Sequence, residues 1–295
     1  MIYSPQDLSL EEFAGPEPKF AVFGHPIAHS LSPQMQNAAL KMLAKSRPDL
    51  AKSKYYAFDI EPEKLPDALG QFLEKKFLGM NLTIPHKEVV LPFLKEIDGL
   101  AESAKACNTL LASDGGWIGF NTDGYGLEGA LNLAFGRRFK GAEVVILGAG
   151  GAARGAAFYA LKQGCSSLAI ANRSKDRLER LVGDIGEAGF KCAGLALTPD
   201  VKIPDSAIVV NATSVGLGSS DAPVLDFSKF PKGAVFFDMP YAKGRQTASV
   251  RAARAEGIKA ESGLAMLAYQ GAKSMNIWTG ADIGELEKVM LEAIL

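Results

Sequence analysis

The fold of this chain is decided by Glu143-Val-Val-Ile-Leu-Gly148-Ala-Gly150-Gly-Ala-Ala153-Arg-Gly155. A short apolar strand runs directly into a glycine-rich turn, and an alanine-rich helix (152–163) follows. In a dinucleotide-binding turn the first glycine permits the tight turn and the second lets a pyrophosphate approach the backbone. A small third residue lets helix and strand pack closely. Glycine-rich turns also occur for structural reasons alone, but the strand before this one and the helix after it favour a nucleotide site.

The next predicted strand, 167–172, indicates which nucleotide is bound. An NAD site usually has Asp or Glu at the end of this strand, where the carboxylate holds the ribose 2′-hydroxyl. This chain has Asn172 there, followed by Arg173, Ser174, Lys175 and Arg177. Cations without an acid suit a 2′-phosphate, and guanidinium suits phosphate best. The alternative is a solvated helix start, but positive charges at a helix N-terminus oppose the helix dipole. The sequence therefore predicts NADP.

The composition is that of an ordinary globular chain with room for two domains: 295 residues, 47% hydrophobic, with a net charge of −1. This charge gives no general reason to bind nucleic acid or a membrane. Cys107, Cys165 and Cys192 form no CxxC pair, which indicates a reducing compartment. We see no secretory signal and no apolar run that could span a bilayer. We therefore expect a cytoplasmic protein, and the sequence does not distinguish a monomer from a homodimer.

Strands and helices alternate in the first part of the chain, which predicts a mainly parallel sheet with right-handed crossovers. Residues 1–18 are polar and rich in proline, and we expect a loose arm there. Strands are predicted at 19–23, 55–60 and 77–82, with a helix around 65–73 and a hairpin of 107–111 with 117–120. Another helix starts at Ser32-Pro33, with Ser32 as its N-cap and Pro33 as its first residue.

A helix at 127–135 leads into the nucleotide domain. That domain is expected to add helices at 175–188 and 247–256, and strands at 207–210, 234–237 and 258–261. Two closing helices follow at 264–278 and 284–294. We therefore expect an α/β fold with a substrate-binding and catalytic domain (1–125), a Rossmann-type NADP domain (126–262) and C-terminal helices (263–295).

Polar clusters follow several strands of the first domain, where open α/β sheets hold ligands. The hydroxyls of Ser30 and Ser32 could hold a carboxylate or sugar-like hydroxyl groups, although Ser32 could equally serve only as a cap. Lys87 stands at a helix start, where the dipole disfavours a cation, so it is either solvated or placed for function. Asp123 is either a turn residue or the partner of Lys87. A lysine held by a carboxylate can orient a carbonyl, stabilise a developing alkoxide and pass a proton.

Two other classes of chemistry lack support in the sequence. His25, His29 and His86 show no metal-ligand spacing, so we expect no metal site. There is no Ser-His-Asp order and no nucleophile elbow to indicate a hydrolase.

Together these motifs resemble those of the shikimate dehydrogenase family, from about Phe20 to the C-terminus. They are Gly24-His-Pro-Ile-Ala-His-Ser-Leu-Ser-Pro33, Asn81-Leu-Thr-Ile-Pro-His-Lys87, Asn108-Thr109, Asn121-Thr-Asp123, the glycine-rich turn with Asn172-Arg-Ser174, Asn211-Ala-Thr-Ser-Val-Gly216, and Gly263-Leu-Ala-Met-Leu-Ala-Tyr-Gln270. So many motifs in the right order are more specific than any one of them.

The resemblance implies two domains with a cleft between them and final helices that fold back onto the first domain. It implies an oxidoreductase of aromatic amino-acid biosynthesis that reversibly reduces 3-dehydroshikimate to shikimate with NADPH, while Lys87 and Asp123 manage the alcohol proton. The implied substrate ligands are Ser30, Ser32, Asn81, Thr83, Asn108, Tyr241 and Gln270. The implied NADP ligands are Gly148, Ala149, Gly150, Gly151, Ala152, Asn172, Arg173, Ser174, Arg177, Thr213, Gly263 and Met266.

The chain departs from the family pattern in the loop after Tyr241, which lacks the usual proline and Thr-Pro pair, so this loop near the nicotinamide could have a different shape. Leu82 and Cys107 replace a valine and an aliphatic residue, with an expected effect on packing more than on chemistry.

Two alternative functions stay open. One is a quinate or quinate/shikimate dehydrogenase with NAD tolerance, since quinate differs by a hydroxyl on the carboxylate-bearing carbon. The other is a catalytically silent NADP-binding regulator, against which Lys87 and Asp123 weigh.

Overall fold

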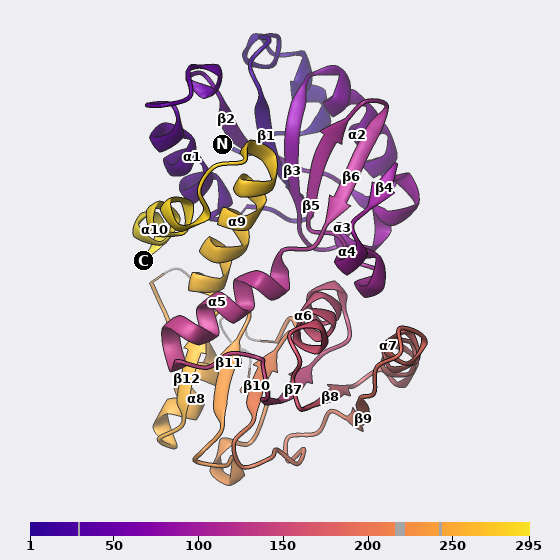
Figure 1. Ribbon diagram of the computed structural model, residues 1–295, viewed down its shortest axis with the longest axis vertical. Coiled ribbons are helices and arrows are strands. Elements are labelled where there is room, and N and C mark those ends of the chain that lie inside the picture. Colours follow the sequence, from indigo (N-terminus) through magenta and orange to yellow (C-terminus); the bar gives the residue numbers. More distant parts are fainter. Residues whose placement is uncertain (29, 216–221, 242–243) are drawn as a thin grey trace. The chain divides into compact units, whose positions relative to one another are not determined.

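The protein is described by a computed structural model that covers residues 1–28, 30–215, 222–241 and 244–295 (Figure 1). The chain divides into two compact units. Unit 1 contains Met1–Thr122 together with Ala268–Leu295, and unit 2 contains Asp123–Leu267. The predicted α/β fold is confirmed, because unit 1 is built on a mixed six-stranded sheet and unit 2 on an all-parallel six-stranded sheet. Among the described residues, no helix has both the length and the apolar character needed to cross a membrane.

Unit 1 alternates strands with short and long helices. Its strands are β1 (Lys19–Gly24), β2 (Lys54–Asp59), β3 (Phe77–Leu82), β4 (Glu96–Ile97), β5 (Thr109–Ser113) and β6 (Gly116–Phe120). Its α-helices are α1 (Ser32–Leu43), α2 (Leu65–Glu74), α3 (His86–Val89), α4 (Gly99–Ala104), the part of α9 (Leu264–Thr279) from Ala268 on, and α10 (Ile283–Ile294). Its 3₁₀ turns are Pro5–Ser9, Glu11–Phe13, Pro48–Leu50, Pro62–Lys64 and Leu91–Phe93.

The strand order in unit 1 is β2-β1-β3-β5-β6-β4. The pairs β2–β1, β1–β3 and β6–β4 are parallel, whereas β3–β5 and the predicted hairpin β5–β6 are antiparallel. Successive side chains of a strand point to opposite faces of the sheet, and in β1 both faces carry apolar side chains. Helices therefore cover both faces of the sheet. On one face Phe23 packs edge-on against Phe72 of α2, with ring centroids 4.6 Å apart, while on the other face Phe20 lies 5.2 Å from the ring of Trp278 in α9.

The N-terminal arm is ordered, so the prediction of a loose arm was wrong. Tyr3 pairs with β2: its N–H donates to Ala57 O at 2.9 Å and its carbonyl accepts from Asp59 N at 2.8 Å. Phe13 is buried in the core. The ammonium of Lys19, itself buried, donates to carbonyls of the arm and of α2's C-terminal end. Apolar residues spaced among the prolines therefore anchor the arm.

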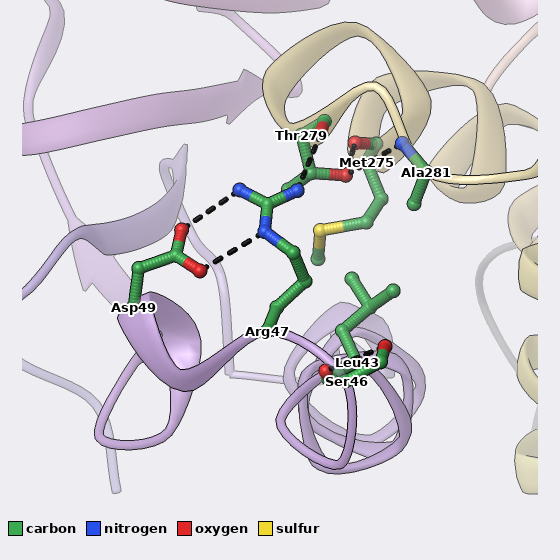
Figure 2. A network of polar contacts seen from close by, with 7 residues as sticks. All are labelled: Leu43, Ser46, Arg47, Asp49, Met275, Thr279 and Ala281. Atoms are coloured by element: carbon green, nitrogen blue, oxygen red, sulfur yellow. Dashed lines mark hydrogen bonds and ion pairs between the residues drawn. The ribbon is translucent and has the colours of Figure 1, made fainter.

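The C-terminal helices pack within unit 1, where α10 lies against α1 (Figure 1). Figure 2 shows the connection at the end of α9. The Arg47 guanidinium forms two hydrogen bonds with Asp49, at 2.9 and 2.7 Å, and a third with Thr279 O at 3.0 Å. The Thr279 hydroxyl in turn donates to Met275 O at 2.7 Å, and the indole N–H of Trp278 donates to Leu110 O at 2.9 Å. The bonds of Arg47 and Trp278 fix the end of α9 against the segment that follows α1 and against β5.

Unit 2 is a doubly wound sheet with the strand order β12-β11-β10-β7-β8-β9. Its strands are β7 (Glu143–Leu147), β8 (Ser167–Asn172), β9 (Ala193–Ala196), β10 (Ile208–Asn211), β11 (Val235–Asp238) and β12 (Lys259–Ser262). Its helices are α5 (Asp123–Phe135), α6 (Gly151–Lys162), α7 (Lys175–Glu187), α8 (Ala248–Ala255), the 3₁₀ turn Phe227–Lys229 and the start of α9. Apart from β9 and the 3₁₀ turn, these elements were predicted, although α5 begins earlier than expected. The sequence also did not predict β4 or α4 of unit 1, and the apolar patterns of β9, β4 and α4 are short.

Candidate functional site

The two serines of the first motif lie where β1 leads into α1. The Ser30 hydroxyl accepts a hydrogen bond from the Ser32 backbone N–H at 3.3 Å. The prediction that Ser32 caps α1 was wrong: Leu31 holds the N-cap position without a side-chain bond, and Ser32 is the first helical residue. The Ser32 side chain is buried at this first position of the helix.

Asn81, at the end of β3, is held from three sides. Its Oδ1 accepts from the Tyr55 hydroxyl at 2.8 Å. Its Nδ2 donates to Asn108 O at 3.1 Å, to Thr109 Oγ1 at 3.1 Å and to Ser274 Oγ at 2.9 Å. Burial raises the pKa of Tyr55 well above its usual value, so this hydroxyl keeps its proton.

Asn108 lies beside Asn81 and belongs to the same buried network. Its Oδ1 accepts from the Thr122 backbone N–H at 2.8 Å and from the Thr109 hydroxyl at 3.0 Å. Its Nδ2 donates to Thr122 Oγ1 at 3.0 Å and to Gln270 Oε1 at 3.3 Å. Asn81, Asn108 and Gln270, predicted from motifs far apart in the chain, are therefore brought together within unit 1 (Met1–Thr122 with Ala268–Leu295).

Tyr55, Thr109, Thr122 and Ser274 complete this network, although none was among the predicted site residues. Thr109 and Thr122 stand inside the quoted motifs, which is a signal that could have found them. Ser274 follows Gln270 by one helical turn and so shares its helix face. Tyr55 carries no local signal, because alternation along β2 does not tell which of two adjacent tyrosines faces polar partners.

Lys87, the predicted catalytic residue of unit 1, is a half-buried residue of α3. The backbone around it is fixed on both sides. Its carbonyl accepts from Cys107 N at 2.8 Å, and His86 N donates to Thr83 O at 2.8 Å. The His86 side chain is buried with Nε2 2.8 Å from Ile60 O, and burial lowers the pKa of this imidazole. The lysine therefore projects from a rigid strand-to-helix junction.

Asp123, the predicted partner of Lys87, is the first residue of α5 and belongs to unit 2. Its side chain is buried. The helix dipole favours a carboxylate in this first turn.

The glycine-rich turn in unit 2 has the predicted strand–turn–helix form. Gly148 follows β7 with φ +114°, a conformation that favours glycine, and a Cβ there would lie 3.0 Å from Ala212 O. Gly150 is the N-cap of α6 and supplies no side-chain cap, so the N–H groups of the first turn remain for other acceptors. Gly151 and Ala152 follow as half-buried residues of that turn, Ala149 is buried before it, and Ala153 packs in the interior.

The predicted phosphate-binding cations lie at the end of β8. Asn172 closes that strand, and its Nδ2 donates to Ser174 O at 2.9 Å. Ser174 caps α7 by accepting from Arg177 N at 3.4 Å. The side chains of Arg173 and Arg177 are exposed. Two guanidinium groups and the start of α7 therefore follow directly after the end of β8.

Thr213, predicted to contact NADP, is positioned by a second buried network. Its N–H and hydroxyl both donate to Asn211 Oδ1, at 3.0 and 2.7 Å. The Asn211 Nδ2 donates to Asp238 Oδ1 at 2.6 Å, and the Thr247 hydroxyl donates to Asp238 Oδ2. Burial raises the pKa of Asp238 to about 6, although both hydrogen bonds lower it.

The remaining predicted residues follow β11 and β12. Tyr241 is half-buried, and residues 242–243 of the loop after it lie outside the described residues, as do His29 and Gly216 of the quoted motifs. Gly263 is required by close packing, because a Cβ there would collide with Met239 O. Met266 is buried in the first turn of α9. Among the described residues, no group of three or more His, Cys, Asp or Glu side chains could hold a metal ion.

Two family models match the chain. Residues 22–110 match the shikimate dehydrogenase substrate binding domain, and residues 131–223 match the shikimate / quinate 5-dehydrogenase family. The first range contains Ser30, Ser32, Asn81, Lys87 and Asn108, and the second contains the glycine-rich turn.

Full-length relatives give the same result. The chain is 38% identical over 280 residues to a protein from Methanopyrus kandleri named shikimate dehydrogenase (NADP(+)), with 93% of each covered. Its fold matches the shikimate 5-dehydrogenase from Thermus thermophilus, solved in complex with NADP(H) and shikimate, with a TM-score of 0.79, 36% identity and 94% and 99% of the two chains covered. It also matches the enzyme from Listeria monocytogenes, solved with shikimate and NAD, with a TM-score of 0.81, 28% identity and coverage of 95% and 98%.

Proposed function

Because the chain belongs to the shikimate dehydrogenase family, we propose that it catalyses the reversible NADPH-dependent reduction of 3-dehydroshikimate to shikimate. The observation that carries this proposal is the buried network of Asn81, Asn108 and Gln270 in unit 1. Three amides held together at the end of a sheet provide directional hydrogen bonds for a small polyhydroxylated acid.

The residues of unit 2 suit NADP. The uncapped first turn of α6 and the positive-φ Gly148 would receive the pyrophosphate. Exposed Arg173 and Arg177 would hold the 2′-phosphate, since there is no carboxylate at the end of β8 to prefer a ribose hydroxyl. Ala149, Gly150, Gly151, Ala152, Asn172, Ser174, Thr213, Gly263 and Met266 complete the proposed cofactor site.

In unit 1, Ser30 and Ser32 would hold the substrate carboxylate, while Asn81, Thr83, Asn108 and Gln270 would hold its ring hydroxyl groups. Tyr241 is proposed as a further substrate ligand. We propose domain boundaries at residues 125 and 262. Cytoplasmic location and a monomer or homodimer belong to the same proposal, and light scattering in solution measures the oligomeric state.

NADPH, when bound, supplies the hydride for the carbonyl carbon of the substrate. The Lys87 ammonium would donate a hydrogen bond to the carbonyl oxygen, stabilise the alkoxide charge that develops there and transfer a proton to it. Water would then return a proton to the lysine. Asp123 would orient Lys87 and keep it charged, because a neighbouring carboxylate favours the ammonium form. In the reverse direction the same amine accepts the hydroxyl proton.

The decisive experiment is absorbance of reduced nicotinamide with purified protein, shikimate and NADP, repeated with quinate and with NAD. Fast NADP reduction by shikimate, with little signal for the other combinations, is the expected result. If NADPH binds but no combination turns over, the chain would be a silent NADP-binding regulator instead.

A quinate or quinate/shikimate dehydrogenase with NAD tolerance is the second candidate. It is favoured by the description of the second family model, which includes quinate, and by the NAD-bound Listeria neighbour. Faster turnover with quinate than with shikimate would establish it in place of the first.

A further inference from the structure

The orientation of Asn81 is fixed by the protein backbone. Its Nδ2 faces the Asn108 carbonyl at 3.1 Å, and a carbonyl oxygen can only accept. The other end of the amide is therefore the oxygen, which faces the Tyr55 hydroxyl at 2.8 Å. Because Oδ1 carries no hydrogen, Tyr55 must be the donor in this bond.

A tyrosine hydroxyl has one hydrogen, and that of Tyr55 is used by Asn81 Oδ1. Tyr55 is 2% exposed, so this bond joins β2 to β3 in a site shielded from water.

The orientation passes on from Asn81 to Asn108. Thr109 Oγ1 accepts from Asn81 Nδ2 and donates to Asn108 Oδ1. The Thr122 backbone N–H also donates to this Oδ1, which leaves Nδ2 as the end of Asn108 directed toward Gln270. The hydrogen bonds from Tyr55 through Asn81, Thr109 and Asn108 to Gln270 therefore all run in one direction.

We propose that Tyr55 is a positioning residue of the substrate site, whose hydroxyl holds the Asn81 amide in the orientation that receives the substrate. This inference rests on the proposed function, in which Asn81 is a substrate ligand. Tyr55 acts through Asn81 and is itself buried. Because Asn81 Oδ1 faces Tyr55 and has two lone pairs, its second lone pair suits a ligand hydroxyl group that donates a hydrogen bond.

The test compares Tyr55→Phe with Tyr56→Phe. Both remove one hydroxyl from neighbouring buried positions of β2, but the ring of Tyr56 packs in the apolar core on the other face. Tyr55→Phe leaves the oxygen of Asn81 without its donor and should raise KM for shikimate roughly tenfold. We expect kcat to stay within about twofold, because Asn81 binds the ground state and the transition state alike. NADPH affinity should not move, although the urea midpoint should fall slightly because a buried acceptor loses its donor. Tyr56→Phe should match the wild type.

Thr109 provides an independent pair of variants. It is fully buried. Thr109→Val removes the hydroxyl that joins Asn81 to Asn108 and should raise KM as Tyr55→Phe does, whereas Thr109→Ser keeps the hydroxyl and should restore it. Combining Tyr55→Phe with Thr109→Val should give less than the product of the two effects, since both act on Asn81.

Three results would overturn the inference. An unchanged KM in Tyr55→Phe would remove Tyr55 from the site. A parallel loss of NADPH affinity and urea midpoint in Tyr55→Phe, with no recovery by Thr109→Ser relative to Thr109→Val, would make the network a matter of folding alone. Wild-type protein that does not turn over shikimate would overturn the proposed function and this inference together, whereas an active wild type with an unaffected Tyr55→Phe would overturn only the inference.

Discussion

The Asn211 Nδ2 lies 2.6 Å from Asp238 Oδ1, where the parallel strands β10 and β11 end side by side. The orientation of this amide is unambiguous, because its Oδ1 accepts from the Thr213 backbone N–H. The carboxylate of Asp238 must therefore accept both from Asn211 and from Thr247. Thr213, a proposed NADP ligand, is held through Asn211 by a buried acid.

This relationship predicts the result of exchanging the two residues. Asn211→Asp places two carboxylates together and should weaken NADPH binding by roughly tenfold or more. Asp238→Asn has one oxygen for two donors and should be damaging as well. In the double variant, an acid at 211 accepts from Thr213 and from an amide at 238, whose oxygen accepts from Thr247. Fluorescence titration of NADPH should show recovery in the double variant; losses that multiply would contradict the assigned donor pattern.

Asp238 also predicts a dependence of stability on pH. Burial raises the pKa of this carboxyl from 3.8 to about 6, so the folded state binds the proton more tightly than the unfolded chain. The free energy of unfolding should therefore fall as the pH rises from about 4 to about 6, by up to roughly 3 kcal/mol from this group. Carbon-13 NMR of the carboxyl should give a midpoint near 6, and Asp238→Asn should lack this contribution in urea unfolding. A midpoint near 4 would show that the two hydrogen bonds outweigh the loss of hydration.

Lys87→Ala should lower kcat by about a thousandfold, because the proton donor and the charge opposite the developing alkoxide are both lost. NADPH affinity, which depends on unit 2, should stay nearly intact. Lys64→Ala is the matched control, since it removes an exposed lysine of unit 1 that pairs with Glu61 at 2.7 Å. Stopped-flow absorbance separates the chemical step from release; preserved turnover would remove Lys87 from the mechanism.

Arg173→Ala should weaken NADP binding roughly tenfold or more and NAD binding much less, because only NADP has the phosphate that the guanidinium contacts. Arg251→Ala is the control, an exposed arginine of α8 that donates to Gln246 O at 2.8 Å. Calorimetric titration with both nucleotides measures the ratio. Equal weakening of both would assign Arg173 another role.

Arg47→Ala should loosen the end of α9, since it removes the donor to Thr279 O together with the pair to Asp49 (Figure 2). Faster hydrogen exchange over residues 273–283, with unit 2 unchanged, is the expected result. Asp49→Asn keeps the bond to Thr279 and should have a smaller effect. If exchange in this segment were the same in Arg47→Ala and wild type, Trp278 alone would suffice to anchor the helix.

Much of the fold follows from short stretches of sequence. The glycine-rich turn, the helix that starts at Lys175 and the strand that ends at Asn172 depend on residues close in the chain, so local rules predict them. The same is true of the alternation of strands and helices, which predicts the α/β class. The only sequence signal for antiparallel pairing in the sheet of unit 1 was the hairpin predicted for residues 107–111 and 117–120.

Only the tertiary structure decided which residues far apart in the chain contact one another. Ser32 has the sequence of an N-cap, yet Leu31 holds that position and Ser32 is buried as the first residue of α1. Residues 1–18 have the composition of a loose arm, yet Tyr3 pairs with the sheet and Phe13 is buried in the core. The network around Asn81 likewise joins β2, β3, β5 and α9. A hydroxyl or amide can choose among many partners, and only the folded arrangement fixes which donor meets which acceptor, because each buried polar group must be satisfied by whatever lies beside it.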